Sequence, residues 1–529
     1  MARKRIFQIK SVLGGASALA YTGQKGQFLA SIAIDPESNN DTSASNIQDL
    51  SSGIITPVRY ASFASTNLVA APMWMLTTPI NSNVYIYDAG GKLTSYPSTL
   101  TTTSSATIGT ATSGAGNGAY YYNNYLWLFT ATNVTRYGPL SDSPALINSS
   151  WTGSSYTGTS GGLGLTALTN TTYPSIYNFT YPNHAAHLHY GKLYVCDFKN
   201  GIGYIHFIKT ITATVLGDTN DGSKYNALAL PEGYYPFDIE SYGSDLIIVC
   251  SQVGTSSTIK PGKGMLFFWD TFSSKPYRGI ELPDTYGTAL LTHNGIPYVW
   301  SGAIGRGVRL SRYFGGNELN QVEYFEDGTP PSAGAVDSLG NRLAWGGITN
   351  YPSTIAGVYS KGFVSPKLPG DSLNQIGRIS GTGTIPVVTV IKYVQENNNV
   401  PIFGWRTDTP AEYGLEGSNG EQSSVTFGSI FRSEVVNIGQ PFQISKIRFP
   451  FSKQMVSGVS IVPKVMVDDE VSTTTLDTIN PTNDSGKYNA VRNVSINGEH
   501  NFFIELAFEG TIHLSINLPI TVELEVIED

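Results

Sequence analysis

The stretch Tyr242-Gly243-Ser244-Asp245-Leu246-Ile247-Ile248-Val249-Cys250 is a tight turn followed at once by an apolar strand. A looser segment separates it from Gly264-Met265-Leu266-Phe267-Phe268-Trp269, a glycine followed by a second apolar strand. Short apolar runs bounded by turn residues favour antiparallel β-strands. This two-strand unit recurs along the chain, and a recurring unit of this size predicts a repeat fold.

Five further copies of the unit align with it. The copies that begin at Tyr190, Asn294 and Gly340 are clear, and those at Met73 and Asn124 are weaker. The first apolar residues of the four clear strands, Leu193, Leu246, Ile296 and Leu343, lie 53, 50 and 47 residues apart. This spacing is close to the roughly 40 to 50 residues of a four-stranded propeller blade. Radial stacking of such blades buries apolar faces that a single blade leaves exposed.

We therefore expect an all-β protein with two parts: a β-propeller of about six degenerate blades, residues 51–365, and a C-terminal β-sandwich-like domain, residues 385–529. A Pro- and Gly-rich linker, residues 366–384, separates them. In the terminal part, Ile520-Thr521-Val522-Glu523-Leu524-Glu525-Val526-Ile527 alternates apolar and polar residues, as a strand with one buried face does. Residues 146–182, rich in Ser, Thr, Gly, Asn and Tyr, predict a surface insertion, and residues 1–50 an N-terminal arm or partial blade. The alternative is a run of unrelated hairpins in a large β-sandwich or β-solenoid.

Composition limits the classes of partner. The net charge of -8 and pI near 5.5 argue against a surface that grips nucleic-acid phosphates, whereas a channel that DNA passes without specific binding is compatible. No stretch approaches the roughly 20 apolar residues of a membrane span. Gln8 and Lys10 interrupt the apolar run that a signal peptide needs. Cys196 and Cys250 each end an apolar run, as free thiols in a core do.

Three histidines, His184, His187 and His189, form the densest cluster of functional side chains. The repeat alignment places them on the innermost strand of a blade, and alternation along that strand puts His187 and His189 on one face, within reach of one metal. No acidic or cysteine residue stands at metal-ligand spacing nearby. Polar inner strands are also common in propellers, so we assign no metal, no cofactor and no cofactor-binding residue.

No enzyme motif emerges, so we expect no enzyme and assign no catalytic residue. The sequence has no Gly-x-Ser-x-Gly, His-Glu-x-x-His or phosphate-loop pattern. Asp238 and Glu240 could form an acid and base pair, but the sequence alone does not bring two carboxylates together. We interpret Asp468-Asp469-Glu470 as a solvated acidic turn rather than a calcium site. The Trp269-Asp270 pair occurs once, and we interpret its tryptophan as a core aromatic residue.

A short basic start, a Ser-, Thr-, Asn-, Gly- and Tyr-rich propeller and a terminal β-sandwich together resemble the structural proteins of bacteriophage virions. More narrowly, residues 50–529 resemble in architecture the tail nozzle and tail-tube propeller proteins of short-tailed phages. The resemblance implies a virion tail protein that is made in the host cytoplasm. It would form a homo-oligomeric ring around the DNA passage and would also contact other tail proteins. The resemblance implies no catalytic residue.

A second hypothesis comes from a different class of protein. It is a surface propeller that binds or cleaves a host-surface glycan. Tyr120, Tyr121, Tyr122 and Tyr125 would then serve as exposed platforms for sugar rings. Oligomerisation and glycan binding of the purified protein separate the two hypotheses.

Overall fold

The computed structural model describes part of the 529 residues. These are residues 2–9, 30–32, 54–55, 61–63, 68–80, 83–96, 106–110, 116–130, 134–140, 155–156, 184–199, 201–209, 224–252, 263–303, 307–325, 330–339, 342–349, 355–362, 372–378, 387–393, 401–407, 411–417, 429–433, 435–468, 472–509, 514 and 516–527. The expected insertion at 146–182 lies outside them except for 155–156, which form an outer strand.

Seven four-stranded antiparallel sheets follow one another in the described part of the chain. Blades 1 to 3 are β5 (Pro72–Thr77), β6 (Val84–Asp88), β7 (Lys92–Tyr96), β8 (Ala106–Thr110); β9 (Gly118–Tyr122), β10 (Tyr125–Phe129), β11 (Val134–Tyr137), β12 (Ser155–Tyr156); and β13 (Ala186–His189), β14 (Lys192–Lys199), β15 (Ile202–Ile208), β16 (Lys224–Ala229). Blades 4 and 5 are β17 (Tyr234–Tyr242), β18 (Asp245–Gln252), β19 (Met265–Trp269), β20 (Arg278–Glu281); and β21 (Tyr286–His293), β22 (Ile296–Ala303), β23 (Gly307–Arg312), β24 (Asn320–Phe325). Blades 6 and 7 are β25 (Val336–Leu339), β26 (Arg342–Thr349), β27 (Ile355–Gly362), β28 (Ser372–Arg378); and β29 (Val387–Tyr393), β30 (Pro401–Arg406), β31 (Tyr413–Gly417), β4 (Ala61–Phe63). A short 3-10 helix, Ala333–Ala335, precedes β25.

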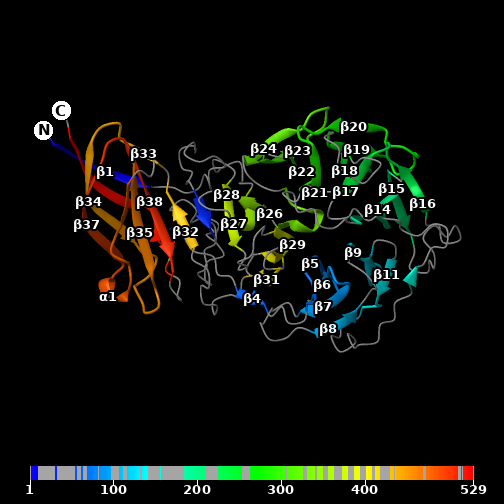
Figure 1. Ribbon diagram of the computed structural model, residues 1–529, viewed down its shortest axis with the longest axis horizontal. Coiled ribbons are helices and arrows are strands. Elements are labelled where there is room, and N and C mark those ends of the chain that lie inside the picture. The colour runs from blue at the N-terminus through cyan, green and yellow to red at the C-terminus, as the bar shows by residue number, and fades with distance from the viewer. Residues whose placement is uncertain are drawn as a thin grey trace.

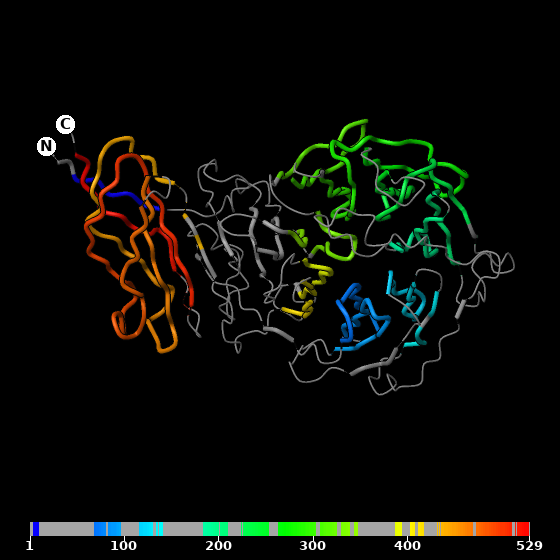
Figure 2. The backbone as a smooth tube through the Cα atoms, in the orientation of Figure 1, coloured from blue at the N-terminus to red at the C-terminus, as the bar shows by residue number. Residues whose placement is uncertain are grey.

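The seven sheets form a closed β-propeller. Each innermost strand lies against the innermost strand of the next blade, and β29 of blade 7 lies against β5 of blade 1. Figures 1 and 2 show the sheets in chain order around one axis. The apolar clusters lie between blades: Leu193 and Val195 of blade 3, for example, pack against Trp127 and Phe129 of blade 2. The repeat prediction is therefore confirmed.

The number of blades and the domain boundary differ from the prediction. Residues 387–417, expected in the terminal domain, form three strands of a seventh blade, and β4 from the N-terminal part of the chain completes it. Residues 372–378, expected in the linker, form the outer strand of blade 6. This blade could not be recognised from the sequence because its first strand is buried on both faces. Its residues Val388, Thr389, Val390 and Ile391 are all buried, as they are in a strand of many other folds.

The terminal part consists of two antiparallel sheets around one core. The first sheet has the order β1 (Ala2–Ile9), β40 (Ile520–Ile527), β34 (Phe442–Pro450), β37 (Asn489–Gly498). The second has the order β2 (Ala30–Ile32), β32 (Ser429–Arg432), β38 (Asn501–Phe508), β35 (Ile461–Val467), β36 (Ser472–Thr475), with β33 (Val436–Asn437) beside β38. A two-stranded pair, β3 (Ile54–Ile55) with β39 (Ile516–Asn517), and one helix, α1 (Pro481–Asp484), complete it.

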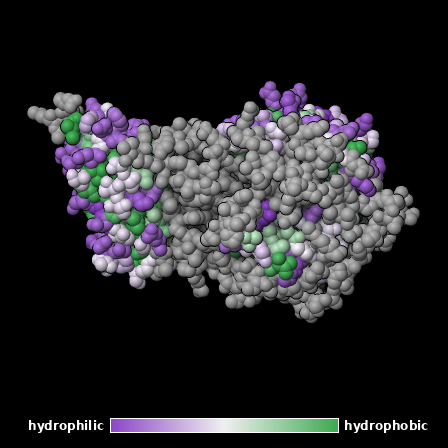
Figure 3. Space-filling model, in the orientation of Figure 1, coloured by the Kyte–Doolittle hydropathy of each residue, from purple (hydrophilic) through white to green (hydrophobic). Residues whose placement is uncertain are grey.

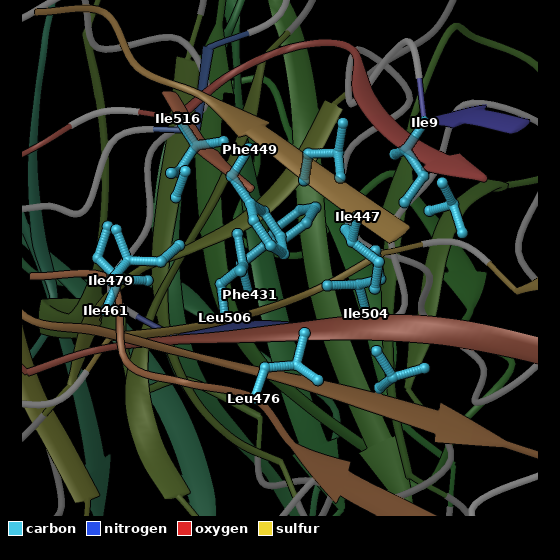
Figure 4. Close-up of a cluster of buried hydrophobic side chains, with 14 of the residues drawn as sticks. Ile9, Phe431, Ile447, Phe449, Ile461, Leu476, Ile479, Ile504, Leu506 and Ile516 are labelled. Atoms are coloured by element: carbon cyan, nitrogen blue, oxygen red, sulfur yellow. The ribbon is translucent and has the colours of Figure 1, made fainter. Parts of the chain in front are cut away.

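The core of this part joins both sheets. Figure 4 shows Phe449 and Ile447 of the first sheet beside Phe431, Ile504 and Leu506 of the second. In β40 every second residue is buried, as the alternation predicted. On the outer face, the Glu523 carboxylate pairs with Lys4 at 3.0 Å and with Lys446 at 3.4 Å. Figure 3 shows this part with hydrophilic and hydrophobic side chains interspersed on the visible face.

The propeller is an insertion in the two-sheet part. β1 and β2 belong to the sheets of the two-sheet part, whereas the prediction placed residues 1–50 in an N-terminal arm or partial blade. The chain then contributes β3 and β4, runs through the blades, and returns to the same two sheets from β32 onward. β1 pairs with β40 over all eight of its residues, so the first and last described strands are neighbours.

Candidate functional site

Polar side chains near the ends of several innermost strands link one blade to the next. They lie just before the tight turn that leads to the second strand. In blades 6 and 7, Lys392 Nζ lies 3.1 Å from Asp337 Oδ1, and the backbone N–H of Tyr393 donates to Asp337 Oδ2 at 2.7 Å. In blades 4 and 5, Thr292 Oγ1 donates to the Ser241 carbonyl at 2.9 Å. The turns allow this because residues such as Asn294 and Gly295 adopt the positive φ angles of a two-residue hairpin.

The densest such contact lies between blades 3 and 4, and we call it the seam. It comprises His187 and His189 of β13 with Glu240 and Ser241 of β17. Ser241 Oγ is 2.8 Å from His187 Nε2 and 2.8 Å from His189 Nδ1, so both imidazoles converge on one hydroxyl. The strand alternation thus correctly predicted that the two histidines share a face. They meet a serine from the neighbouring blade, which no spacing along the chain could indicate.

The Ser244 carbonyl at one end of the seam fixes the directions of the seam hydrogen bonds. Burial lowers the pKa of His189, so its ring is neutral near pH 7. His189 Nε2 lies 3.1 Å from the Ser244 carbonyl, which can only accept, so Nε2 carries the proton and Nδ1 accepts from the Ser241 hydroxyl. The hydroxyl oxygen in turn accepts from His187 Nε2–H. The chain of bonds therefore runs from His187 through Ser241 and His189 to the Ser244 carbonyl.

Glu240 lies at the other end of this chain. Its Oε1 is 3.5 Å from His187 Nδ1, and the two side chains are 19% and 18% exposed. Burial raises the pKa of Glu240 well above its usual value, against the opposing effect of hydrogen bonds from Thr292. Burial, with the nearby His189, lowers the pKa of His187 to about 4.

Serine, histidine and glutamate in this order resemble a hydrolase triad, but the bond directions differ. In a triad the imidazole accepts the hydroxyl proton. Here His187 donates to the Ser241 oxygen, and the hydroxyl proton points to His189. The seam joins two blades through a directed hydrogen-bond chain and does not present an activated nucleophile. Asp238, the other expected carboxylate, accepts from Leu290 N–H of blade 5 at 2.8 Å, and burial raises its pKa to about 7.

The third histidine of the cluster, His184, lies apart from the seam in a fully buried network of blade 3. His206 Nδ1 accepts from the Asn226 N–H at 2.9 Å, so His206 Nε2–H donates to Asp197 Oδ2 at 3.0 Å. His184 Nδ1 donates to the Cys196 carbonyl at 2.8 Å and lies 3.8 Å from Asp197 Oδ1. Within the described ranges, no group of three or more His, Cys, Asp or Glu side chains could hold a metal ion.

The remaining predicted residues have structural partners. Trp269 is buried and its Nε1 donates to the Ser273 carbonyl at 2.6 Å, while Asp270 accepts from Ser273 Oγ at 2.7 Å. Asp468 accepts from the His500 N–H at 2.8 Å, which ties two loops of the terminal part together. Residues 469–470 lie outside the described ranges. Cys196 and Cys250 are free and buried, as expected.

The four tyrosines expected as exposed platforms are not exposed. Tyr122 is 4% exposed and its hydroxyl donates to the carbonyls of Gly191 and Lys209, each at 2.7 Å. Tyr120, Tyr121 and Tyr125 are half-buried against the cores beside blade 2. Their phenol rings therefore pack between blades, because the inner strands of a propeller face their neighbours on both sides.

Exposed aromatic rings lie instead on the turns of blades 3 to 5. These are Tyr190, 75% exposed, Phe272, 86%, Tyr277, 54%, and Phe314, 53%, which we call the aromatic ridge. Tyr190 is in the turn between the first and second strands of its blade, and the others lie between the third and fourth strands of theirs. Successive antiparallel strands reverse direction, so these turns are all at the same end of the propeller.

A series of contacts links Tyr190, Tyr277 and Phe314 of the ridge. The Tyr190 ring lies 4.4 Å from the ring of His189, whose Nε2 donates to Ser244. Ser244 precedes Asp245, which accepts from the Tyr277 hydroxyl at 2.5 Å. The neighbouring Arg278 donates to the Tyr313 hydroxyl at 2.9 Å, next to Phe314. Large side chains fixed in this way and left facing solvent are typical of a protein interface.

Comparisons with known proteins bear on the fold alone. No family of known proteins and no curated protein sequence matches the chain. Solved structures similar to it include the WD40 domain of Neurospora crassa Pan2, at 10% identity over 68% of this chain and 95% of that one with a TM-score of 0.38. The WD40 β-propeller domain of Doa1 is 9% identical over 69% and 97% with a TM-score of 0.39. The computationally designed Ika8 protein is 10% identical over 67% and 98% with a TM-score of 0.36.

None of the helices in the described residues has the length and apolar character needed to cross a bilayer.

Proposed function

We propose that this protein is a non-enzymatic structural component of a bacteriophage virion, which forms a homo-oligomeric ring in the tail around the DNA passage. The aromatic ridge is the observation that carries the proposal. Four rings that are more than half exposed lie at one end of the propeller, and contacts through His189, Asp245 and Arg278 link three of them, Tyr190, Tyr277 and Phe314. Such rings are the side chains that dominate the binding energy of protein interfaces. The proposed occupant is a neighbouring copy of the chain.

The inserted propeller also supports an assembly role. The chain enters and leaves the propeller through the same pair of sheets, so two covalent connections hold it. A single linker would let the domains rotate relative to each other. The net charge of -8 suits a surface that DNA passes without binding.

The first prediction concerns the ridge. Replacing Phe272 and Phe314 by serine should weaken self-association by a factor of about 30 or more, because a central aromatic anchor contributes about 2 kcal/mol to an interface. Sedimentation velocity over a series of concentrations measures the association, and circular dichroism checks the fold. Tyr488→Ser is the matched control, since Tyr488 is 61% exposed but lies on the terminal part.

Two outcomes would contradict the proposal. A wild-type protein that stays monomeric at every concentration and is absent from purified phage particles removes the assembly function. Oligosaccharide binding on a glycan array, lost in the double variant and kept in Tyr488→Ser, would favour the glycan hypothesis instead.

A further inference from the structure

In the seam, one nitrogen acceptor, His187 Nδ1, lies beside one oxygen acceptor, Glu240 Oε1. His187 Nε2 carries a proton because it donates to Ser241, so a neutral His187 has only a lone pair at Nδ1. This nitrogen lies 3.5 Å from Glu240 Oε1. An ionised Glu240 beside a neutral His187 would place two acceptors in contact in a site where both side chains are four-fifths buried. The geometry therefore calls for one proton between them.

We infer that Glu240 and His187 share a single proton, and that this proton makes the contact between blades 3 and 4 pH-sensitive. The contact is stable while the proton is bound and weakens when it is lost. Two placements of the proton satisfy the geometry: a protonated Glu240 that donates to His187 Nδ1, or a charged His187 that donates to Glu240. The number of protons in the pair is one in both.

Groups from five innermost strands surround the pair. The Tyr120 ring of β9 lies 6.5 Å from the His187 ring, and burial raises the pKa of its phenol, so it stays neutral. His189 of β13 is neutral and held by Ser241. Asp238 of β17 adds negative charge that favours a protonated Glu240, while Thr292 of β21 and the Lys392 charge of β29 favour the carboxylate. Lys392 is itself paired with Asp337.

The pH dependence follows from counting protons. When the seam opens, Glu240 regains its ordinary pKa near 4.3 and ionises above about pH 5.5. A Glu240→Gln variant keeps a donor to His187 but has no proton to release. His187 titrates in the opened form of both proteins, so its proton cancels in the comparison. Relative to the variant, the opened wild type therefore binds one proton fewer than the closed form. The sign is that wild-type stability falls relative to the variant as the pH rises.

The experiment compares amide hydrogen exchange of β13 in the two full-length proteins from pH 5.5 to 8, after correction for intrinsic exchange. The ratio of local opening constants, wild type over Glu240→Gln, should rise about tenfold per pH unit and level off where the pair releases its proton. Because glutamine and a protonated glutamate are both uncharged, the contribution of Asp238 is the same in the two proteins while the pair holds its proton, and it cancels in the ratio. Glu281→Gln, an exposed glutamate paired with Lys263, is the matched control and should follow the wild type.

A ratio that stays constant between pH 5.5 and 8 would overturn the inference. If Glu240→Gln does not fold, ring-15N-labelled histidine in the wild-type protein gives a second measurement. His187 should then show no titration midpoint near pH 6.5, in either placement of the shared proton. An ordinary midpoint at about 6.5 would mean that His187 exchanges its proton independently of Glu240.

Discussion

One buried residue, Asp197, connects neighbouring strands of blade 3 through hydrogen bonds. Asp197 is 1% exposed and accepts from the His206 ring and from the Phe198 N–H, at 3.0 and 2.9 Å. Both donors are in places that water does not reach, so they depend on this carboxylate. Burial also lowers the pKa of the neighbouring His184, which favours its neutral ring.

The second residue-scale prediction follows from this network. Asp197→Ala should destabilise the propeller by about 3 kcal/mol, because it leaves two buried donors without an acceptor. Glu281→Ala removes an exposed ion pair and should change stability by less than about 0.5 kcal/mol. Urea denaturation followed by tryptophan fluorescence compares the variants. Equal losses for the two would show that the Asp197 carboxylate has no structural role.

The pH dependence of His184 has a definite sign. Its pKa in the folded protein is lower than the 6.5 of an unfolded chain, so its contribution to stability is present above pH 6.5 and is lost as the pH falls. A His184→Gln variant should therefore lose less stability than the wild type between pH 6.5 and 5. Thermal midpoints over this range measure the difference, and a parallel decline of the two proteins would contradict the assignment.

At the scale of single residues the sequence revealed the histidine cluster and missed its partners. Alternation along β13 predicts that His187 and His189 share a face, because side-chain direction in a strand has period two. Ser241, Glu240 and Asp197 come from other strands or the neighbouring blade, and contacts of this kind depend on how blades pack. The tyrosines of blade 2 show the converse: their number suggested a surface role, but the blade packing buries them.

The strands repeat one irregularity that the sequence pattern does not display. In blades 1, 4, 5 and 7 the innermost strand has a register shift against the second strand, and the residue-to-residue register skips Met73, Phe237, Thr288 and Thr389. A bulge re-aims the side chains that follow it. It turns Asp238 toward the next blade, and in blade 7 Thr389 donates to the Pro72 carbonyl of blade 1.

β4 is the element that closes the ring. It pairs with β31 through Ala61, Ser62 and Phe63, and so ties an early segment of the chain to the last blade. β12, Ser155–Tyr156, is also a short outermost strand, but it pairs with β11, the strand before it in the chain, and so does not close the ring. The sequence could not distinguish them, since two or three residues carry too little periodicity for a strand prediction.

Deleting residues 61–63 should therefore lower the thermal midpoint more than deleting residues 155–156. We expect a decrease of about 3 to 4 °C for β4, which corresponds to about 3 kcal/mol in a propeller of this size. The β12 deletion should cost less than about 1 °C. Differential scanning calorimetry gives both values. Similar decreases would mean that β4 acts as an ordinary edge strand.

Over the whole molecule, the sequence predicted an all-β chain and a propeller but misplaced the boundary. The period of the middle repeats was correct, and the seventh blade was missed because its strands come from two distant parts of the chain. Strand pairing across such distances leaves no local pattern. The alternation of β40 correctly predicts a strand with one buried face, whereas the prediction of an N-terminal arm or partial blade for residues 1–50 misses its neighbour β1.

The revised boundary changes where the chain can be divided. Truncation after residue 370 removes β28 and three strands of blade 7, so the ring cannot close and the product should be insoluble or readily digested. A fragment of residues 54–428 keeps all seven blades with β4 and should resist trypsin. Limited proteolysis with mass spectrometry tests both fragments. A compact, protease-resistant 1–370 fragment would contradict the seven-blade closure.

The pairing of β1 with β40 also sets an order of events during synthesis. β1 is translated before the propeller, but its partner is made only after the whole propeller has been translated, because more than five hundred residues separate the paired strands. Until then the edge of β1 has no native neighbour, and its Lys4 and Arg5 provide charges of the kind that discourage pairing with another chain. The two-sheet part therefore forms after the last blade has been translated, and a chain that stops early cannot complete it.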